Sequence, residues 1–301
     1  MRDTFVATTT ALLDEDPRTA LVLADISADA FAPALRRHPD RALNVGIREQ
    51  LMVGVGGGLA LTGMRPYLHS YAPFLIDRAY EQIKLDLGHQ DTGAVLVSIG
   101  GSYDAAAAGY THQSPGDVAL LDTLDGWTVQ VPGHRDEVPA MLRAAARHDD
   151  RVYIRLGLQE NARAHPDAGR LRVVKRGGPL VLAVGPMLDP VLAATRDLDV
   201  TVAYTNTPRP LDVEGLRSLA EGEVVVVEPY LAGTSARLVS EALSGIPHRA
   251  LHLGAGRAEI RDYGTWQDHA REHGLDAAGL RTSITAFLGQ EAFLGQEAFL
   301  G

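Results

Sequence analysis

Apolar runs of strand length alternate with helical patterns along the first half of the chain. The strand-like runs cover 19–26, 43–45, 66–71, 94–99, 127–131 and 152–156. Amphipathic helical patterns lie between them, near 28–37, 49–62, 74–87, 115–124 and 136–147. Because this alternation is typical of strand–helix–strand units, it predicts a parallel sheet wrapped by helices.

The alternation pauses and then restarts in the second half. The segment 159–174 is rich in Asn, His, Pro, Asp and Gly, and is predicted to be an exposed linker. Beyond it, strand-like runs recur at 179–184, 200–204, 223–228 and 249–253, with helical patterns near 189–197, 212–220, 234–244 and 266–273. We therefore predict an α/β protein with two parallel-sheet domains, at 1–158 and 175–289.

The chain closes with a six-residue repeat. Ala286-Phe-Leu-Gly-Gln-Glu is followed by Ala292-Phe-Leu-Gly-Gln-Glu and then by Ala298-Phe-Leu-Gly301. This period matches neither the heptad nor the helical repeat, so it builds no continuous apolar face. We expect 290–301 to be a repetitive tail without a functional role.

Composition narrows the classes of partner. The length of 301 residues fits about two domains, and the formal net charge of −10 argues against nucleic acid and anionic membranes, which attract basic surfaces. The absence of cysteine excludes disulfides, a thiolate nucleophile and cysteine-ligated metal. The N-terminal residues lack the apolar core of a signal peptide, and no apolar run approaches about 18 residues, so we expect a cytoplasmic protein.

One acidic residue, Glu49, stands at the start of a predicted helix. It lies in the segment Asn44-Val-Gly-Ile-Arg-Glu49-Gln. The apolar positions of the helix recur at helical spacing, at Leu51, Met52, Val55, Leu59 and Leu61. Small residues at 54–58 would let a backbone or a flat ligand come close. From this local pattern alone, the simpler interpretation is an acid that complements the positive end of a helix.

Several motifs, in this order, resemble the pyrimidine-binding domain of transketolases. They are the Glu49 segment with its glycine-rich helix, Tyr71-Ala-Pro-Phe74, Arg78-Ala-Tyr-Glu-Gln-Ile83 and Tyr110-Thr-His112-Gln. In the second half, Val224-Val-Val-Val-Glu-Pro229 and the segment 264–280 look like the transketolase C-terminal domain. The resemblance covers the chain up to its tail and points to the C-terminal subunit of a split transketolase.

The resemblance implies thiamine diphosphate as the cofactor, which reacts as a carbanion and supplies the electron sink. Glu49 would bond the aminopyrimidine and favour its activating tautomer. Phe74 would stack on this ring, and Tyr71 would lie on the same wall. Asp25 and Ile26, which end the first strand, would border the cofactor. The alternative for the two aromatic residues is ordinary core packing.

His112 is the second predicted catalytic residue. In the transketolase motif Gly-Pro-Thr-His-Gln, which it resembles, the His faces the reacting carbonyl and moves protons. Here Tyr110 replaces the usual Pro. For Arg78, two interpretations remain: a surface ion pair or a role in the site.

Two departures from the family pattern concern the substrate. Ala108 stands four residues before His112, where transketolases that act on sugar phosphates commonly have Asp. The phosphate-contacting Ser of the family aligns near Ser27 to Asp29, and a carboxylate at Asp29 would repel phosphate, although an offset of two residues would restore Ser27. These positions and His112 are the predicted substrate-binding residues, and the departures favour a specialised acceptor.

The sequence contains no Gly-Asp-Gly motif, through which full-length transketolases bind the diphosphate and Mg²⁺. Gly116-Asp117-Val118 differs from it, and Gly54-Val-Gly-Gly-Gly58 lacks the dinucleotide spacing. We therefore expect a separate N-terminal diphosphate-binding subunit, which supplies most Mg²⁺ ligands, in an α2β2 heterotetramer. No metal ligand is assigned to this chain, because His269-Ala-Arg-Glu272-His273 fits a solvated helix end better than a zinc site.

Together these features predict a thiamine-dependent subunit that moves a two-carbon ketol unit from a ketose to an aldehyde. The alternatives are the β subunit of a 2-oxoacid decarboxylating dehydrogenase and a non-catalytic scaffold subunit. The Thr111-His112-Gln113 motif favours the transketolase, and the presence of both Glu49 and His112 counts against a scaffold.

Overall fold

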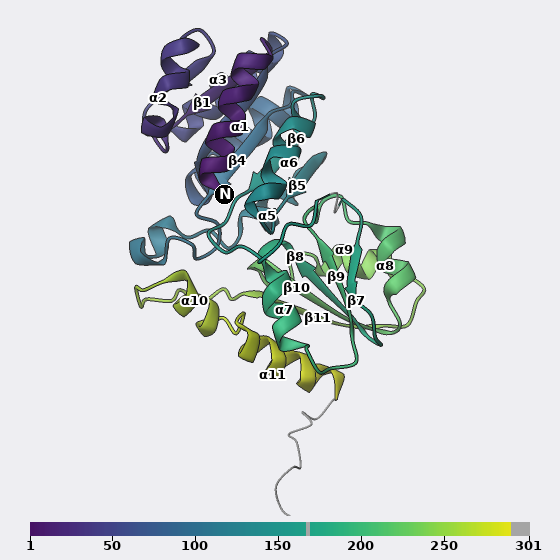
Figure 1. The fold of residues 1–301 in the computed structure, drawn as a ribbon. Helices are drawn as coiled ribbons and strands as arrows, with labels where there is room; N and C mark the ends of the chain where they lie inside the picture. The colour runs from purple at the N-terminus through teal and green to yellow at the C-terminus, as the bar shows by residue number, and fades with distance from the viewer. Residues whose placement is uncertain (167–168, 290–301) are drawn as a thin grey trace, which may run out of the picture.

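The computed structural model describes residues 1–166 and 169–289, which form two sheets flanked by helices (Figure 1). The N-terminal half, drawn in purple to teal, lies above the C-terminal half, drawn in green to yellow. The predicted repetitive tail, 290–301, lies outside the described residues. Two α/β units in sequence order therefore agree with the predicted fold class.

The first sheet has six strands, all parallel, in the order β2-β1-β3-β4-β6-β5. Its strands are β1 Thr19–Leu23, β2 Ala42–Asn44, β3 Arg65–Tyr71, β4 Val95–Ile99, β5 Trp127–Gln130 and β6 Arg151–Arg155. Each predicted apolar run overlaps one of them. Side chains alternate along a strand, so Leu21 and Leu23 pack into one core and Val22 into the core on the opposite face. Burial on both faces explains why these strands are almost continuously apolar.

Helices cover both faces of this sheet. The regular ones are α1 Arg2–Glu15, α2 Ala28–Arg37, α3 Glu49–Leu61, α5 Asp117–Leu121 and α6 Val138–Ala145. The helix α1 was not predicted from the sequence. Thr8 and Thr9 are buried between Phe5 and Leu12, so the buried face of α1 includes hydroxyl side chains that blur its apolar period.

The α3 helix forms where it was predicted, but its buried face differs. Met52 and Val53 are buried, whereas Leu51 and Leu61 are 46% and 63% exposed. Two of the five helically spaced apolar positions, Leu51 and Leu61, therefore lie off the buried face of α3. Gly56 and Gly57 are buried instead, because Leu68 and Asp86 leave no room for a side chain there.

The single helix predicted near 74–87 is interrupted. The segment consists of a π-helical turn η1 Pro73–Asp77, a short α4 Tyr80–Gln82 and a second π-helical turn η2 Ile83–His89. A π turn accommodates an extra residue in a helix and is frequent at functional sites. The prediction of a regular helix is wrong here, and the irregularity falls on the motif that contains Phe74.

The second sheet has five strands in the order β11-β10-β8-β9-β7. They are β7 Arg172–Lys175, β8 Leu180–Val184, β9 Thr201–Thr205, β10 Glu223–Leu231 and β11 Arg249–Ala255. The edge strand β7 pairs antiparallel with β9, so this sheet is mixed rather than purely parallel. β7 also begins inside the segment 159–174 that was predicted as a linker. The domain boundaries themselves stay a prediction.

Helices pack on this sheet as well, and α11 runs beside α7 in Figure 1. They are α7 Leu188–Ala194, α8 Val213–Leu219, α9 Ala236–Ala242, α10 Trp266–Glu272 and α11 Ala277–Leu288. No helix among the described residues is long and apolar enough to cross a membrane.

Hydrogen bonds join the two halves directly. The Val131 amide donates to the Asn206 carbonyl at 2.7 Å, and Asn161 Nδ2, from the predicted linker, donates to the Gly185 carbonyl at 3.0 Å. Arg209 Nε donates to Asp122 Oδ1 at 2.8 Å. These bonds fix the carboxyl edge of the first sheet against the second half of the chain.

Candidate active site

Glu49 begins α3 at the carboxyl edge of the first sheet and is completely buried. The Ser70 hydroxyl donates a hydrogen bond to Glu49 Oε1 at 2.9 Å. Arg78 Nη1 donates to Glu49 Oε2 at 2.6 Å and forms an ion pair with it. Both carboxylate oxygens have a partner, which offsets part of the cost of removing a charge from water.

The Arg78 guanidinium also covers an aromatic ring. Its Cζ atom lies 4.2 Å from the centroid of the Phe74 ring, and its side chain is 37% exposed. Phe74 belongs to the π turn η1 and Arg78 directly follows it. A flat cation therefore rests on an aromatic face while it bonds a buried carboxylate. The ion pair of Arg78 is thus made inside the candidate site and not with a surface carboxylate.

Three rings form a cluster beside this pair. The centroids of Tyr71 and Phe74 are 6.1 Å apart, those of Tyr71 and His112 5.9 Å, and those of Phe74 and His112 5.1 Å, all edge to face. Tyr71 ends β3, and His112 ends the short helix η4 Tyr110–His112. The structure therefore brings four predicted site residues together, with Glu49 linked to the rings through Arg78.

The loop that holds His112 is anchored on both sides. The backbones of Ser102 and Ser114 exchange hydrogen bonds at 3.0 and 3.1 Å, and Ser114 Oγ donates to Asp77 Oδ1 at 2.9 Å. Desolvation raises the pKa of Asp77 to about 6. His112 Nδ1 lies 2.9 Å from Thr111 Oγ1, whereas no hydrogen bond to its Nε2 forms within the described residues. Nε2 is therefore the atom of His112 left for a ligand.

The end of β1 lies beside Asn44, next to the Glu49 segment. Asp25 and Ser27 both have left-handed backbones, with φ of 70° and 62°. Asn44 Oδ1 accepts hydrogen bonds from the amides of Asp25 at 3.0 Å and Gly46 at 3.1 Å. Such a conformation is costly for residues other than glycine, so Asn44 holds a strained turn in place.

Ser27 connects this turn to β3. Its Oγ lies 3.0 Å from His69 Nε2, and His69 Nδ1 lies 2.8 Å from the Val97 carbonyl. The carbonyl can only accept, so Nδ1 holds the proton and Ser27 donates to Nε2. Burial lowers the pKa of His69 to about 4. His69 is therefore neutral at pH 7, and it precedes Ser70, the partner of Glu49.

The remaining predicted residues lie outside the Glu49 cluster. Asp25, Asp29 and Ala108 are exposed and Ile26 is half-buried. Within the described residues, no hydrogen bond or ion pair links Asp25, Asp29 or Ala108 to Glu49 or His112. Their cofactor-binding and substrate-binding roles stay predictions.

Behind the His112 loop lies a second ion pair, in which both side chains are buried. Arg155 Nε donates to Asp117 Oδ2 at 2.7 Å, with the two side chains 4% and 0% exposed. Another nitrogen of Arg155 donates to Ser102 Oγ at 2.7 Å, and Ser102 Oγ donates in turn to the carbonyl of Pro229 in β10. This network joins the His112 loop to the second sheet.

Comparison with known proteins decides the family. Residues 1–162 match the model of the transketolase pyrimidine-binding domain. This chain belongs to the transketolase family. The transketolase-like chain is 50% identical over 294 residues to an uncharacterised 33.6 kDa protein in the fasciation locus of Rhodococcoides fascians, covering 95% of this chain and 94% of that protein.

Two further relatives are described as split enzymes or subunits. The chain is 31% identical over 278 residues to an apulose-4-phosphate transketolase subunit of Actinobacillus succinogenes, covering 86% of this chain and 89% of that protein. A solved split gene transketolase, described as an inactive β4 tetramer, is similar with a TM-score of 0.81 and 27% identity over 96% of this chain and 98% of that one. The predicted resemblance to the C-terminal subunit of a split transketolase is confirmed.

In this transketolase-family chain, sequence reasoning missed the groups that support Glu49. His69 and Ser70 are polar positions in β3, a strand that is buried along almost its whole length. Polar residues in such a strand need partners, and this signal would have singled them out. Asp117 and Arg155 were not predicted as site residues, because neither belongs to a motif with a recognisable chemical role.

The metal-like motif in α10 also has a different environment from the one predicted. His269 is 1% exposed, and its Nε2 lies 2.8 Å from the Asp262 carbonyl, so the expectation of a solvated helix end is wrong for this residue. Among the described residues, no group of three or more His, Cys, Asp or Glu side chains could hold a metal ion.

Proposed function

We propose that this chain is the pyrimidine-binding and C-terminal subunit of a split, thiamine diphosphate-dependent transketolase. It moves a two-carbon ketol unit from a ketose donor to an aldehyde acceptor, and it acts in the cytoplasm. The observation that supports this most is the buried Glu49 carboxylate beside the Phe74 and His112 rings.

The Arg78 guanidinium tests whether these residues fit an aminopyrimidine. Such a ring needs an aromatic face to stack on and a carboxyl group at the edge of that face. Arg78 is a flat, hydrogen-bonding group that uses Phe74 and Glu49 in this way, at 4.2 Å and 2.6 Å. It is therefore a stand-in for the ring, and the residues fit the cofactor once Arg78 moves aside.

The cofactor would supply carbanion chemistry and an electron sink when bound. Glu49 would hydrogen-bond the ring through its carboxyl group, and the Ser70 hydroxyl would fix the orientation of that carboxyl group. Phe74 stacks on the ring, while Tyr71 forms the neighbouring wall and Asp25 and Ile26 border the site.

His112 acts on the substrate side. Its Nε2 makes no hydrogen bond within the described residues, while Nδ1 is engaged by Thr111. Nε2 can then stabilise negative charge on the substrate oxygen and transfer a proton. Ser27, Asp29 and Ala108 are proposed to lie along the path of the substrate.

A partner subunit supplies the rest of the active site. The sequence contains no Gly-Asp-Gly motif, and one relative is named as a transketolase subunit and another as a split gene transketolase. The partner binds the diphosphate, provides most Mg²⁺ ligands and joins this chain in an α2β2 heterotetramer.

Reconstitution tests the proposal. The chain and its partner, mixed with thiamine diphosphate and Mg²⁺, are expected to transfer a ketol unit from hydroxypyruvate to an aldehyde, and Glu49→Gln is expected to abolish this almost completely. Glu228→Gln is the matched control, since Glu228 is also completely buried but lies in the second domain. An active Glu49→Gln complex contradicts the proposed role. Acylation of a lipoyl carrier from a 2-oxoacid, without ketol transfer, would instead identify the dehydrogenase.

A further inference from the structure

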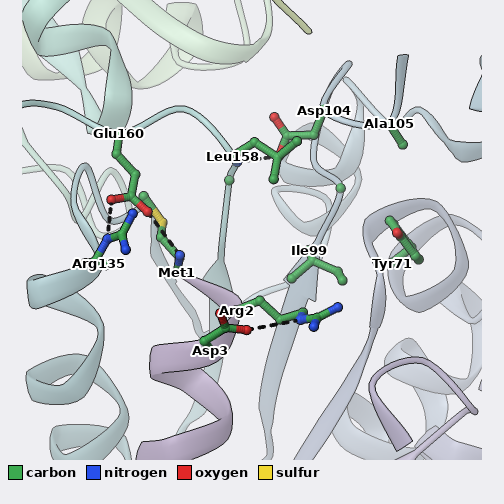
Figure 2. Close-up of a pocket in the computed structure, with 12 residues that line it drawn as sticks. Met1, Arg2, Asp3, Tyr71, Ile99, Asp104, Ala105, Arg135, Leu158 and Glu160 are labelled. Carbon is green, nitrogen blue, oxygen red and sulfur yellow. Dashed lines mark hydrogen bonds and ion pairs between the residues drawn. The ribbon is translucent and has the colours of Figure 1, made fainter. Parts of the chain in front are cut away.

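A cavity of about 440 Å³ lies at the carboxyl edge of the first sheet (Figure 2). Tyr71, which also contacts the Phe74 and His112 rings, forms part of its wall. Ile99, the last residue of β4, and Leu158, which is 63% exposed, add apolar surface. The cavity is therefore adjacent to the proposed reaction centre and lies within this chain.

Each positive group of the cavity has a carboxylate beside it. Arg2 faces Asp3 at 3.5 Å, and Arg135 faces Glu160 at 2.8 Å, as the dashed lines of Figure 2 show. The amino group of Met1 also bonds Glu160, at 3.0 Å. Each positive group is thus partly neutralised by a neighbouring carboxylate, which weakens the attraction of the cavity for a phosphate group.

Among the carboxyl groups that line the cavity, Asp104 forms no ion pair within the described residues. Its Oδ2 accepts a hydrogen bond from the Leu158 amide at 3.0 Å, and neither an ion pair nor a hydrogen bond to Oδ1 forms within the described residues. Burial raises the pKa of Asp104 to about 6, against the opposing effect of Arg155. Oδ1 is therefore a strong acceptor that lacks a donor, and it repels an anionic ligand.

We propose that this cavity receives the acceptor and selects an uncharged, hydroxylated aldehyde without a phosphate group. Asp104 Oδ1 accepts a hydrogen bond from a hydroxyl of the acceptor, and the carbon chain packs against Ile99 and Leu158. Asp104 is the residue that determines this specificity. The inference rests on the proposed ketol transfer, because that reaction defines which molecule is the acceptor.

Binding of unreactive analogues tests the cavity directly. Erythritol and erythritol 4-phosphate are titrated calorimetrically into the complex of this chain with its partner and cofactor. Erythritol is expected to bind at least about tenfold more tightly than its phosphate ester, and Asp104→Asn to weaken erythritol binding about tenfold, as for a hydrogen bond to a charged group. Tighter binding of the ester, no binding of erythritol, or an unchanged affinity in Asp104→Asn overturns the proposal.

A gain of function sharpens the test. Leu158→Arg places an additional guanidinium in the cavity and is expected to reverse the preference in favour of the phosphate ester. Leu61→Arg is the matched control, since Leu61 has the same exposed fraction, 63%, but lies outside the cavity, and the preference should stay unchanged. If both variants change the preference equally, the selectivity is not a property of the cavity.

Rates of ketol transfer to different aldehydes distinguish a failure of this proposal from a failure of the proposed function. Ketol transfer that is faster to erythrose 4-phosphate than to erythrose overturns the acceptor class and leaves the transketolase function in place. Absence of transfer to any aldehyde, with the selectivity for erythritol intact, overturns the transketolase function but supports the recognition of an uncharged polyol by Asp104.

Discussion

Two arginine–carboxylate pairs of the first domain have a completely buried carboxylate but differ in how firmly the arginine is held. Arg155 is 4% exposed, and it contacts Asp117, Ser102 and, at 5.6 Å, the ring of Tyr230 from the second domain. Asp117 in turn accepts a hydrogen bond from Tyr153 at 2.7 Å. Removing Arg155 would leave a buried carboxylate and open the contact between the domains.

In the pair of Glu49 and Arg78, only the carboxylate is buried. Glu49 is completely buried, but Arg78 is 37% exposed, and its guanidinium contacts one carboxylate oxygen and the face of Phe74. Arg78 therefore has a route to solvent that Arg155 lacks. Two equally buried carboxylates thus have cations of very different exposure, and we expect the more exposed cation to be the easier one to exchange.

The largest effect is expected for Arg155→Met. It leaves Asp117 without its cation in a completely buried position, which typically costs about 3–5 kcal/mol. The free energy of unfolding, measured by urea titration, should fall by this amount. Arg143→Met is the control, because Arg143 and Glu15 form an exposed pair that solvent screens, so little stability should be lost. Equal losses in the two variants would contradict the structural role of Arg155.

Low pH should lower the stability of the region around Glu49, because His69 then becomes protonated. Its pKa is lowered to about 4 in the folded chain, against 6.5 for an ordinary histidine, so the unfolded chain binds the proton more readily. The stability contributed by the neutral ring is present above pH 6.5 and is lost as the pH falls toward 4, by a total of about 3 kcal/mol. Urea unfolding at pH 7 and pH 4.5 measures the loss.

The variant His69→Gln supplies the comparison for this pH dependence. It removes the titrating ring, so its loss of stability between the two pH values should be smaller than that of the wild type. Hydrogen exchange should show that the added opening at low pH lies in β1 and β3 rather than around Arg155. The same loss of stability in both proteins would exclude His69 as the cause.

Arg78→Met should cost less than Arg155→Met, about 1–3 kcal/mol in the free chain, because Arg78 is 37% exposed and water can take its place beside Glu49. In the complex with the partner, the variant should bind thiamine diphosphate faster, since no guanidinium must leave Phe74. Stopped-flow fluorescence measures this rate, with Arg48→Met, an exposed arginine just before Glu49, as the control. Slower binding in Arg78→Met would show that Arg78 helps to hold the cofactor instead.

The smallest effects are expected for two buried serines that are paired in register on β3 and β4. Ser70→Ala and Ser98→Ala each remove one hydrogen bond, to Glu49 and to Tyr153, and should each cost about 1 kcal/mol. Only Ser70→Ala should weaken cofactor binding, as measured by titration of the complex. An equal loss of affinity in both variants would mean that the two ion pairs are not independent.

The sequence was informative where the chain follows regular periods. The apolar runs of the first sheet located its strands, because burial on both faces leaves little choice of residue there. The helix α1 escaped prediction, since Thr8 and Thr9 occupy buried positions that an apolar pattern does not include. The strand β7 escaped too, as an edge strand with half-buried and exposed residues has no continuous apolar run.

In the candidate site, the sequence motifs singled out Glu49, Phe74 and His112. They did not predict the contacts through which neighbouring residues connect them. The position of Arg78 depends on the π turn at 73–77, and no helical period in the sequence reveals such an irregularity. Asp104 lies in an irregular loop, and its bond to the Leu158 amide joins positions 54 residues apart. Contacts of this kind are set by tertiary packing and not by spacing along the chain.

The pairing of Arg78 with Glu49 bears on the order of chain folding and cofactor binding. A newly synthesised chain that reaches its fold without any ligand has no bare charge at Glu49, because Arg78 accompanies it from the start. Under the proposed function, folding and cofactor loading would then be separate events, and loading would require the release of one guanidinium from Glu49 and Phe74 and not the rebuilding of a core.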